Sequence, residues 1–153
     1  MWQGKLESIY VASQAAGPVR SLAEVQAVPG FGLEGDRYAL RQGSFFKEPD
    51  PGIELTLIEG EAIDAAEQEY GLKLAPGESR RNLVTRGVPL KDLVGLEFRI
   101  GAIRARGIRL SNPCSYLQRL TGKDVMKGLR HRGGLRAQIL TEGLIRVGDL
   151  ISE

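Results

Sequence analysis

Cysteine and histidine are scarce in this chain: 153 residues contain one of each, Cys114 and His131. A single cysteine cannot form an internal disulfide, so nothing in the composition indicates an oxidising compartment. One cysteine and one histidine cannot supply the three or four ligands of a tetrahedral zinc site, and an iron–sulfur cluster requires more cysteines still. The composition therefore excludes a disulfide framework, a structural zinc site and an iron–sulfur centre.

Long apolar runs and a secretory leader are also missing. No apolar run approaches the ~18 residues that span a bilayer. The first residues show no basic segment followed by an apolar one. We therefore expect a cytoplasmic protein without a membrane partner. The length fits one domain over residues 1–153.

Aromatic residues make up only 6% of the chain, whereas arginines are frequent from position 80 onward. Arginine binds phosphate and planar anions through two hydrogen bonds at once. A nucleic-acid surface would also need aromatic stacking platforms or a known motif, and the chain has neither. We expect most of the arginines to lie on a solvated face, a smaller subset to line an anion pocket, and no nucleic-acid partner.

Short strand-like segments separated by some of the 20 glycines are the main local pattern. Strands are expected over residues 6–12, 54–57, 82–85, 97–100, 103–110, 136–140 and 149–152. A long loop is expected over residues 41–52. Many short strands with glycine punctuation indicate a barrel or a sandwich.

Three short helices are expected as well, over residues 59–70, 113–120 and 124–129. Gly71 and Gly122 are suitable stops for the first two. In the third helix, Val125, Met126 and Leu129 are expected to face inward. Together the patterns predict a mostly β fold, a distorted β-barrel with about three short helices.

Residues 30–35, GFGLEG, match the pattern G-x-G-x-x-G. A dinucleotide-binding fingerprint would have to follow a strand and open a helix inside a βαβ unit. The residues after Gly35 show no helical period, and the strand-rich chain offers no repeated βαβ units. We interpret the motif as a tight loop whose glycines adopt positive φ, and which can present backbone N–H groups to an anion.

Cys114 is the candidate for the chemistry of this chain. It follows Asn112 and Pro113, which suit the cap and first position of a helix, so the thiol is expected in a first helical turn. The positive end of the helix and nearby arginines stabilise a thiolate, the form that acts as nucleophile and metal ligand. A small buried apolar residue is the alternative. A cysteine–histidine hydrolase is a further alternative. The arginines that flank His131 disfavour protonation of its imidazole, so we expect His131 to be a surface residue or to contact an anion rather than to act as a catalytic base.

The ordered motifs of the chain resemble those of the MOSC domain family, named for the C-terminal domain of molybdenum cofactor sulfurase. The resemblance covers nearly the whole chain. Its segments are IYVA (9–12), GFGLEGDRY (30–38), LTLIE (55–59), RRNLVTRGV (80–88), LVGLEFRIG (93–101), PCSYL (113–117), HRGGLRA (131–137) and GLIRVGD (143–149). The resemblance implies a barrel-like fold, similar to that of the pyruvate-kinase barrel domain, and binding of the molybdenum cofactor, a pterin dithiolene that carries a phosphate.

The resemblance also implies roles for particular residues. Cys114 would ligate molybdenum or handle sulfur, because a thiolate is a soft ligand. The cofactor-binding candidates are Arg81, Asn82, Arg132, Gly133 and Asp36. A structural hydrogen-bond network is the alternative for Arg81, Asn82 and Arg132, and bracing of the glycine-rich loop is the alternative for Asp36.

Two positions depart from the family pattern. Several relatives carry a second cysteine where this chain has Ser111, so a mechanism that needs a Cys-x-x-Cys pair is excluded. Relatives often have histidine where this chain has Tyr38, which places any role for a histidine there in doubt. The family is further associated with pyridoxal phosphate binding, at the level of the family only.

Three hypotheses follow from the sequence. The first is an oxidoreductase that binds the molybdenum cofactor (Mo-molybdopterin) through Cys114 and reduces N-hydroxylated or N-oxygenated small molecules, with electrons from a separate electron-transfer protein. The second is a sulfur carrier or cofactor-delivery module with a persulfide on Cys114 and a sulfur-transfer partner. The third is a structural domain with a buried cysteine and no cofactor.

Overall fold

Alternation of buried and exposed side chains explains the strands of the computed structural model, which describes residues 2–14, 16–36, 50–113 and 115–153. In β7 (Glu97–Ile100), Phe98 and Ile100 are buried and the two charged side chains are exposed. The first residues of β8 (Ile103–Leu110) alternate in the same way. A period of two is typical of a sheet with one face on a core and one in solvent. The charged side chains of β7 and β8 pair with each other on the solvent face.

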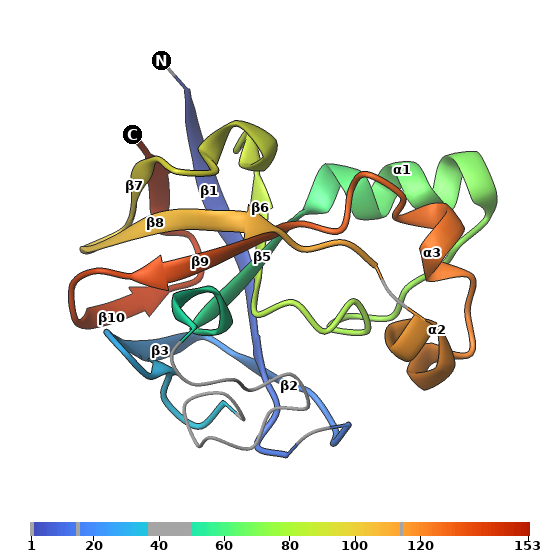
Figure 1. Ribbon diagram of the computed structural model, residues 1–153, viewed down its shortest axis with the longest axis horizontal. Helices are drawn as coiled ribbons and strands as arrows, with labels where there is room; N and C mark the ends of the chain where they lie inside the picture. Colours follow the sequence, from blue (N-terminus) through green and yellow to red (C-terminus); the bar gives the residue numbers. More distant parts are fainter. Residues whose placement is uncertain (1, 15, 37–49, 114) are drawn as a thin grey trace.

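Seven strands close into a barrel, which occupies one side of Figure 1. Besides β7 and β8 they are β1 (Gln3–Val11), β5 (Leu55–Glu59), β6 (Leu83–Arg86), β9 (Leu135–Ile139) and β11 (Leu150–Ser152). Their order is β11-β7-β8-β9-β5-β6-β1, and antiparallel pairing of β1 with β11 closes the ring. Each strand expected from the sequence corresponds to one of these seven, so the predicted distorted barrel is confirmed.

Four short strands were not expected. β2 (Arg20–Leu22) pairs with the end of β1, outside the ring. A separate three-stranded sheet has the order β10-β3-β4 and contains β3 (Glu24–Val28), β4 (Gly32–Leu33) and β10 (Gly143–Arg146). β2 has three residues, and β4 and β10 begin with glycine, so their strand conformation depends on the partner strand rather than on local pattern. β3 alternates buried and less buried side chains, and this pattern was overlooked.

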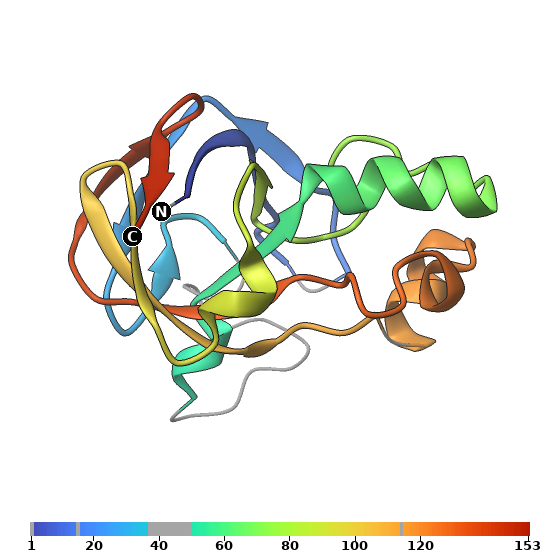
Figure 2. The ribbon, with the colours of Figure 1, turned by 90° about the horizontal axis from the view of Figure 1, so that it is seen from above.

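The three helices lie together at one side of the barrel, as Figures 1 and 2 both show. α1 (Gly60–Tyr70) continues directly from β5 and leads to β6. β5 and β6 pair in parallel, which requires such a crossover. α1 ends at Gly71, whose φ is 67° and whose backbone N–H contacts the carbonyls of the last turn.

α3 (Val125–Gly128) packs against α1, and α2 (Ser115–Thr121) packs against α3. Val125 and Leu129 are fully buried in a cluster between helices and barrel, but Met126 is 45% exposed. The expectation that Met126 faces inward is therefore wrong. Residues 125 and 129 share one face of a helix, and residue 126 lies about 100° away from 125.

The loop expected over residues 41–52 lies mostly outside the described residues. Its last residues enter η1 (Pro51–Ile53), where the Asp50 side chain accepts a hydrogen bond from the Gly52 N–H. A second short 3-10 helix, η2 (Leu90–Leu93), precedes β7. Across the described residues, no helix combines the length and apolar character needed to cross a membrane.

Candidate functional site

Cys114 lies outside the residues that the structure describes, but the three residues before it are placed. They connect the end of β8 to α2. The Ser111 N–H donates to the Gly134 carbonyl at 2.8 Å, and Ser111 is nearly fully buried. The chain that leads to Cys114 is therefore held on the barrel by backbone contacts with residues 133–134.

Arg81 is the main brace of this segment. Its guanidinium is buried and donates from Nε to the Gly133 carbonyl at 2.7 Å. It also donates from Nη2 to the Ser111 carbonyl at 3.3 Å and to the Asn112 carbonyl at 3.4 Å. The guanidinium of Arg81 thus joins residues 111–112 to residue 133. Arginine suits this role because its planar guanidinium carries several N–H donors in a fixed geometry.

Gly133 allows the two segments to approach this closely. A Cβ atom at position 133 would collide with the Ser111 carbonyl and lie 2.8 Å from Cδ of Pro113. The neighbouring Gly134 has φ 110°, and a Cβ there would collide with the Leu57 carbonyl. The absence of a side chain at Gly133 therefore lets the segment before Cys114 pack directly against the backbone of residue 133.

Asn82 is a buried hub of internal hydrogen bonds. Its Oδ1 accepts from the backbone N–H and the hydroxyl of Thr56, each at 3.1 Å, and its Nδ2 donates to the Tyr10 carbonyl at 3.1 Å. These bonds tie β1 and β5 to the start of β6. The structure thus shows a bracing role for Asn82, and contact with a cofactor stays a prediction.

Arg132 lies closer to the surface than Arg81. Its Nη2 donates to Glu69 of α1 at 2.7 Å, and its side chain is 29% exposed. Its Nη1 atom is buried without a hydrogen-bond partner in the described part of the chain. A buried unsatisfied donor is uncommon, and it is a position where a bound acceptor gains a hydrogen bond.

Asp36 and the glycine-rich loop occupy a different place. Asp36 is fully buried, and its Oδ1 accepts the Ala12 N–H at 3.0 Å, so it braces the end of β1. Gly30, Gly32 and Gly35 all have positive φ, as expected of a tight loop. The loop was expected to present backbone N–H groups to an anion, and the anion that accepts the Gly30 N–H, at 3.0 Å, is the buried carboxylate of Glu54 from the same chain.

A pocket of about 640 Å³ adjoins the segment before Cys114. Asn112 and Pro113 line it together with Lys127, Arg130 and His131. Two other lining residues, Asp124 and Met126, come from the start of α3. Two fixed cations face one carboxylate, so the wall favours an anionic ligand.

Tyr70, at the end of α1, forms a further part of the pocket wall. The ammonium of Lys127 lies 5.6 Å from the centre of the Tyr70 ring, a cation–π distance. Sequence reasoning did not select Tyr70 or Lys127, because they come from different helices. The cations at Lys127 and Arg130 were the sequence feature that could have indicated this part of the pocket wall.

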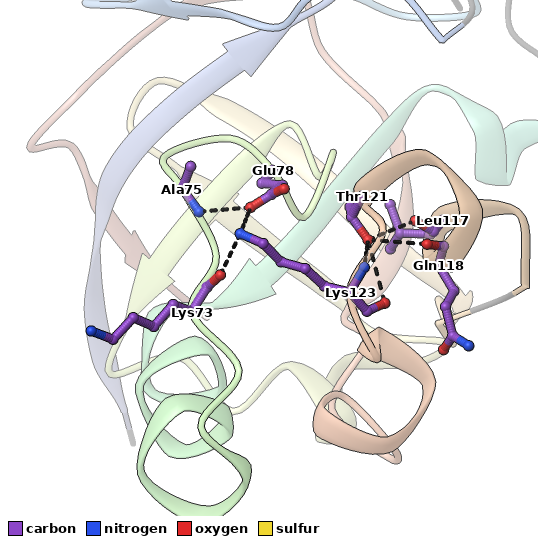
Figure 3. A network of polar contacts seen from close by, with 7 residues as sticks. All are labelled: Lys73, Ala75, Glu78, Leu117, Gln118, Thr121 and Lys123. Atoms are coloured by element: carbon purple, nitrogen blue, oxygen red, sulfur yellow. Dashed lines mark hydrogen bonds and ion pairs between the residues drawn. The ribbon is translucent and has the colours of Figure 1, made fainter.

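The far end of α2 is anchored by a polar network, shown in Figure 3. Nζ of Lys123 donates to Glu78 Oε1 and to the Lys73 carbonyl, each at 2.6 Å. The Thr121 hydroxyl donates to the Leu117 carbonyl and accepts the Lys123 N–H. Lys123 thereby ties the end of α2 to the loop after α1.

No group of three or more His, Cys, Asp or Glu side chains capable of holding a metal occurs among the described residues. Apart from the carboxylate of Asp124, the charged side chains that line the pocket are the cations Lys127 and Arg130. They suit a phosphate-bearing group that brings its own sulfur ligands to a metal better than they suit a bare metal ion.

Solved structures with the same fold were found by comparison. The chain is similar to the YuaD protein of Bacillus subtilis, with TM-score 0.75 and 16% identity, over 99% of this chain and 97% of that one. YiiM of Geobacillus stearothermophilus gives TM-score 0.69 and 17% identity, over 97% and 74%. YiiM of Escherichia coli gives 0.67 and 18%, over 97% and 68%. No curated protein matches the chain in sequence.

These structural similarities define the class of protein: a closed β-barrel with helices packed at one side. The family model of the MOSC domain matches residues 51–152, well over half of the chain. The chain therefore belongs to the MOSC domain family, which is associated with binding of the molybdenum cofactor. The matched range contains Arg81, Asn82, Cys114, Arg132 and Gly133, whereas Asp36 lies before it.

Proposed function

We propose that this protein binds the molybdenum cofactor in the pocket beside Asn112 and Pro113, with Cys114 as the molybdenum ligand, and reduces N-hydroxylated or N-oxygenated small molecules. The observation that carries the proposal is the fixing of the segment before Cys114, by Arg81 and Gly133, at the edge of a pocket with cationic walls. Membership of the MOSC family supports the choice of cofactor.

The residues present fit such a group. Lys127 and Arg130 line the pocket and balance the charge of a phosphate. Arg132 is not among the lining residues, so its contact with the cofactor stays a prediction. We assign Arg81, Gly133 and Asn82 to positioning, because their contacts fix the backbone around the pocket. Asp36 supports the barrel end from further away.

When bound, the cofactor supplies two-electron redox chemistry at molybdenum. The net reaction takes up two electrons and two protons, breaks the N–O bond and releases the oxygen as water. The electrons come from a separate electron-transfer protein, and the protein acts as a single cytoplasmic domain. The task of the chain is to bind, orient and protonate the substrate.

A reductase assay tests this function. Protein from a molybdenum-replete host is supplied with N-hydroxyadenine and reduced methyl viologen, and formation of adenine is measured. We expect turnover by the wild type, loss of at least ~100-fold in Cys114→Ser, since the metal ligand is removed, and no change in Leu150→Ala, an exposed position on β11. Cyanide-labile sulfur on Cys114 in protein without molybdenum or turnover would instead support the sulfur-carrier alternative.

A further inference from the structure

The backbone of His131 adopts an unusual conformation. Its φ is 62°, in the left-handed region that L side chains rarely occupy. Glycine adopts this conformation without steric cost, and two glycines stand close by at positions 133 and 134. Histidine enters this region more often than most other side chains, so the conformation fixes the position of the imidazole, and its role is argued from the pocket that it lines.

The side chain of His131 is exposed and lines the pocket with Asn112 and Pro113. His131 lies three residues after the end of α3, in the turn that follows the buried Leu129. Leu129 is fully buried, and the Arg132 N–H donates to the Leu129 carbonyl at 2.8 Å. The turn that carries His131 is thus closed by the hydrogen bond between residues 129 and 132, and Gly133 follows it.

The proposed reaction consumes two protons, and few groups of the pocket can deliver one near neutral pH. The other titratable or charged groups that face this space are Tyr70 from α1, Asp124 and Lys127 from α3, and Arg130. Arg132, the next residue, is paired with Glu69. Tyrosine, lysine and arginine keep their protons until alkaline pH, and Asp124 accepts the Lys127 N–H as the cap of α3. Histidine is the side chain suited to this task.

We propose that His131 donates a proton to the oxygen that leaves the substrate nitrogen as water. This inference rests on the proposed reductase function. The imidazolium transfers one proton as the N–O bond breaks, the electrons come from the external donor, and solvent reprotonates the exposed ring.

The variant His131→Gly separates this role from a structural one, because glycine suits the left-handed backbone. We expect its melting temperature to equal or exceed that of the wild type, and its molybdenum content to be unchanged. We expect kcat to fall by ~100-fold, the size typical of a lost general acid, and to recover in part when imidazole is added. Ala16→Gly is the matched control, since Ala16 also has positive φ, at 59°, and should retain full activity.

The pH profile supplies a second readout. For the wild type, kcat/KM is expected to be higher at acidic than at alkaline pH, because a general acid must carry its proton, and His131→Asn is expected to show a flatter profile. Unchanged kcat in His131→Gly, or absence of imidazole rescue, overturns the inference while the wild-type reductase stands. If the wild type binds molybdenum but has no reductase activity, the proposed function fails and the inference fails with it.

Discussion

A single carbon atom added at Gly133 would meet the Ser111 carbonyl and the ring of Pro113. The position therefore tests whether close backbone packing holds the segment before Cys114. We expect Gly133→Ala to lower the free energy of unfolding by about 3 kcal/mol, the upper range for overpacking, as measured by urea denaturation.

Gly122→Ala is the matched control for this change. Gly122 has φ 67° and nothing within 4 Å of the added carbon, so the substitution carries only the backbone cost, about 1 kcal/mol. Equal destabilisation by the two variants would contradict the assigned packing role of Gly133. If the account holds, Gly133→Ala also changes the rate at which Cys114 is alkylated, whereas Gly122→Ala does not.

The resemblance to the MOSC family, rather than a residue-level pattern, selected the candidate site residues, and their contact with a cofactor stays a prediction. Arg81, Arg132 and Gly133 were selected from the sequence, and the structure brings Arg81 and Gly133 together beside residues 111–113. Asn82 was selected as a cofactor contact, but its described bonds are internal. Tyr70 was not selected, because a residue at the end of a helix reaches a pocket only through the packing of that helix on others.

At the scale of elements, the anchoring of α2 depends on the carboxylate of Glu78. Burial by itself raises the pKa of Glu78, but the hydrogen bonds from Lys123 and from the Ala75 N–H outweigh it, so the pKa lies below its ordinary value. A carboxyl with a lowered pKa stabilises the folded state above its unfolded pKa, and this contribution is lost as pH falls through the folded pKa.

We therefore expect wild-type stability to decline between about pH 5 and pH 3 more steeply than that of Glu78→Gln. The measurement is the urea midpoint as a function of pH. Glu34→Gln, at an exposed carboxyl, is the control and should follow the wild type. Parallel wild-type and Glu78→Gln curves would show that the Lys123–Glu78 contact does not anchor the helix.

Elements with a strong local pattern were the ones predicted well. β7 and β8 alternate apolar and charged residues, so their bounds could be read directly from the sequence. β2 and β4 span three and two residues, too few to show a period, and they exist because β1 and β3 offer free edges. The inward placement of Met126 failed because α3 is only four residues long and turns one narrow face to the core.

For the whole molecule, closure of the barrel depends on the two ends of the chain. β1 and β11 pair through residues 3–5 and 150–152. Ile151 of β11 is fully buried in the main core, whereas its neighbour Leu150 is 52% exposed. The sequence predicted both strands, but it could not predict that they pair, because they are separated by nearly the full length of the chain.

Ile151→Ala is expected to lower the free energy of unfolding by about 3 kcal/mol, because the side chain of Ile151 is fully buried. Leu150→Ala, on the exposed face of the same strand, is expected to change stability by less than about 0.5 kcal/mol. Both are measured by thermal and urea unfolding. Similar effects of the two substitutions would mean that β11 does not close the core.

The most direct test of the account is the molybdenum and pterin content of protein purified from a molybdenum-replete host. The account predicts about one molybdenum and one pterin per chain in the wild type, since a single cysteine supplies the protein ligand. It predicts loss of molybdenum in Cys114→Ser, with the melting temperature of that variant unchanged. Wild-type protein without molybdenum, or Cys114→Ser with a full complement of it, would contradict the central claim.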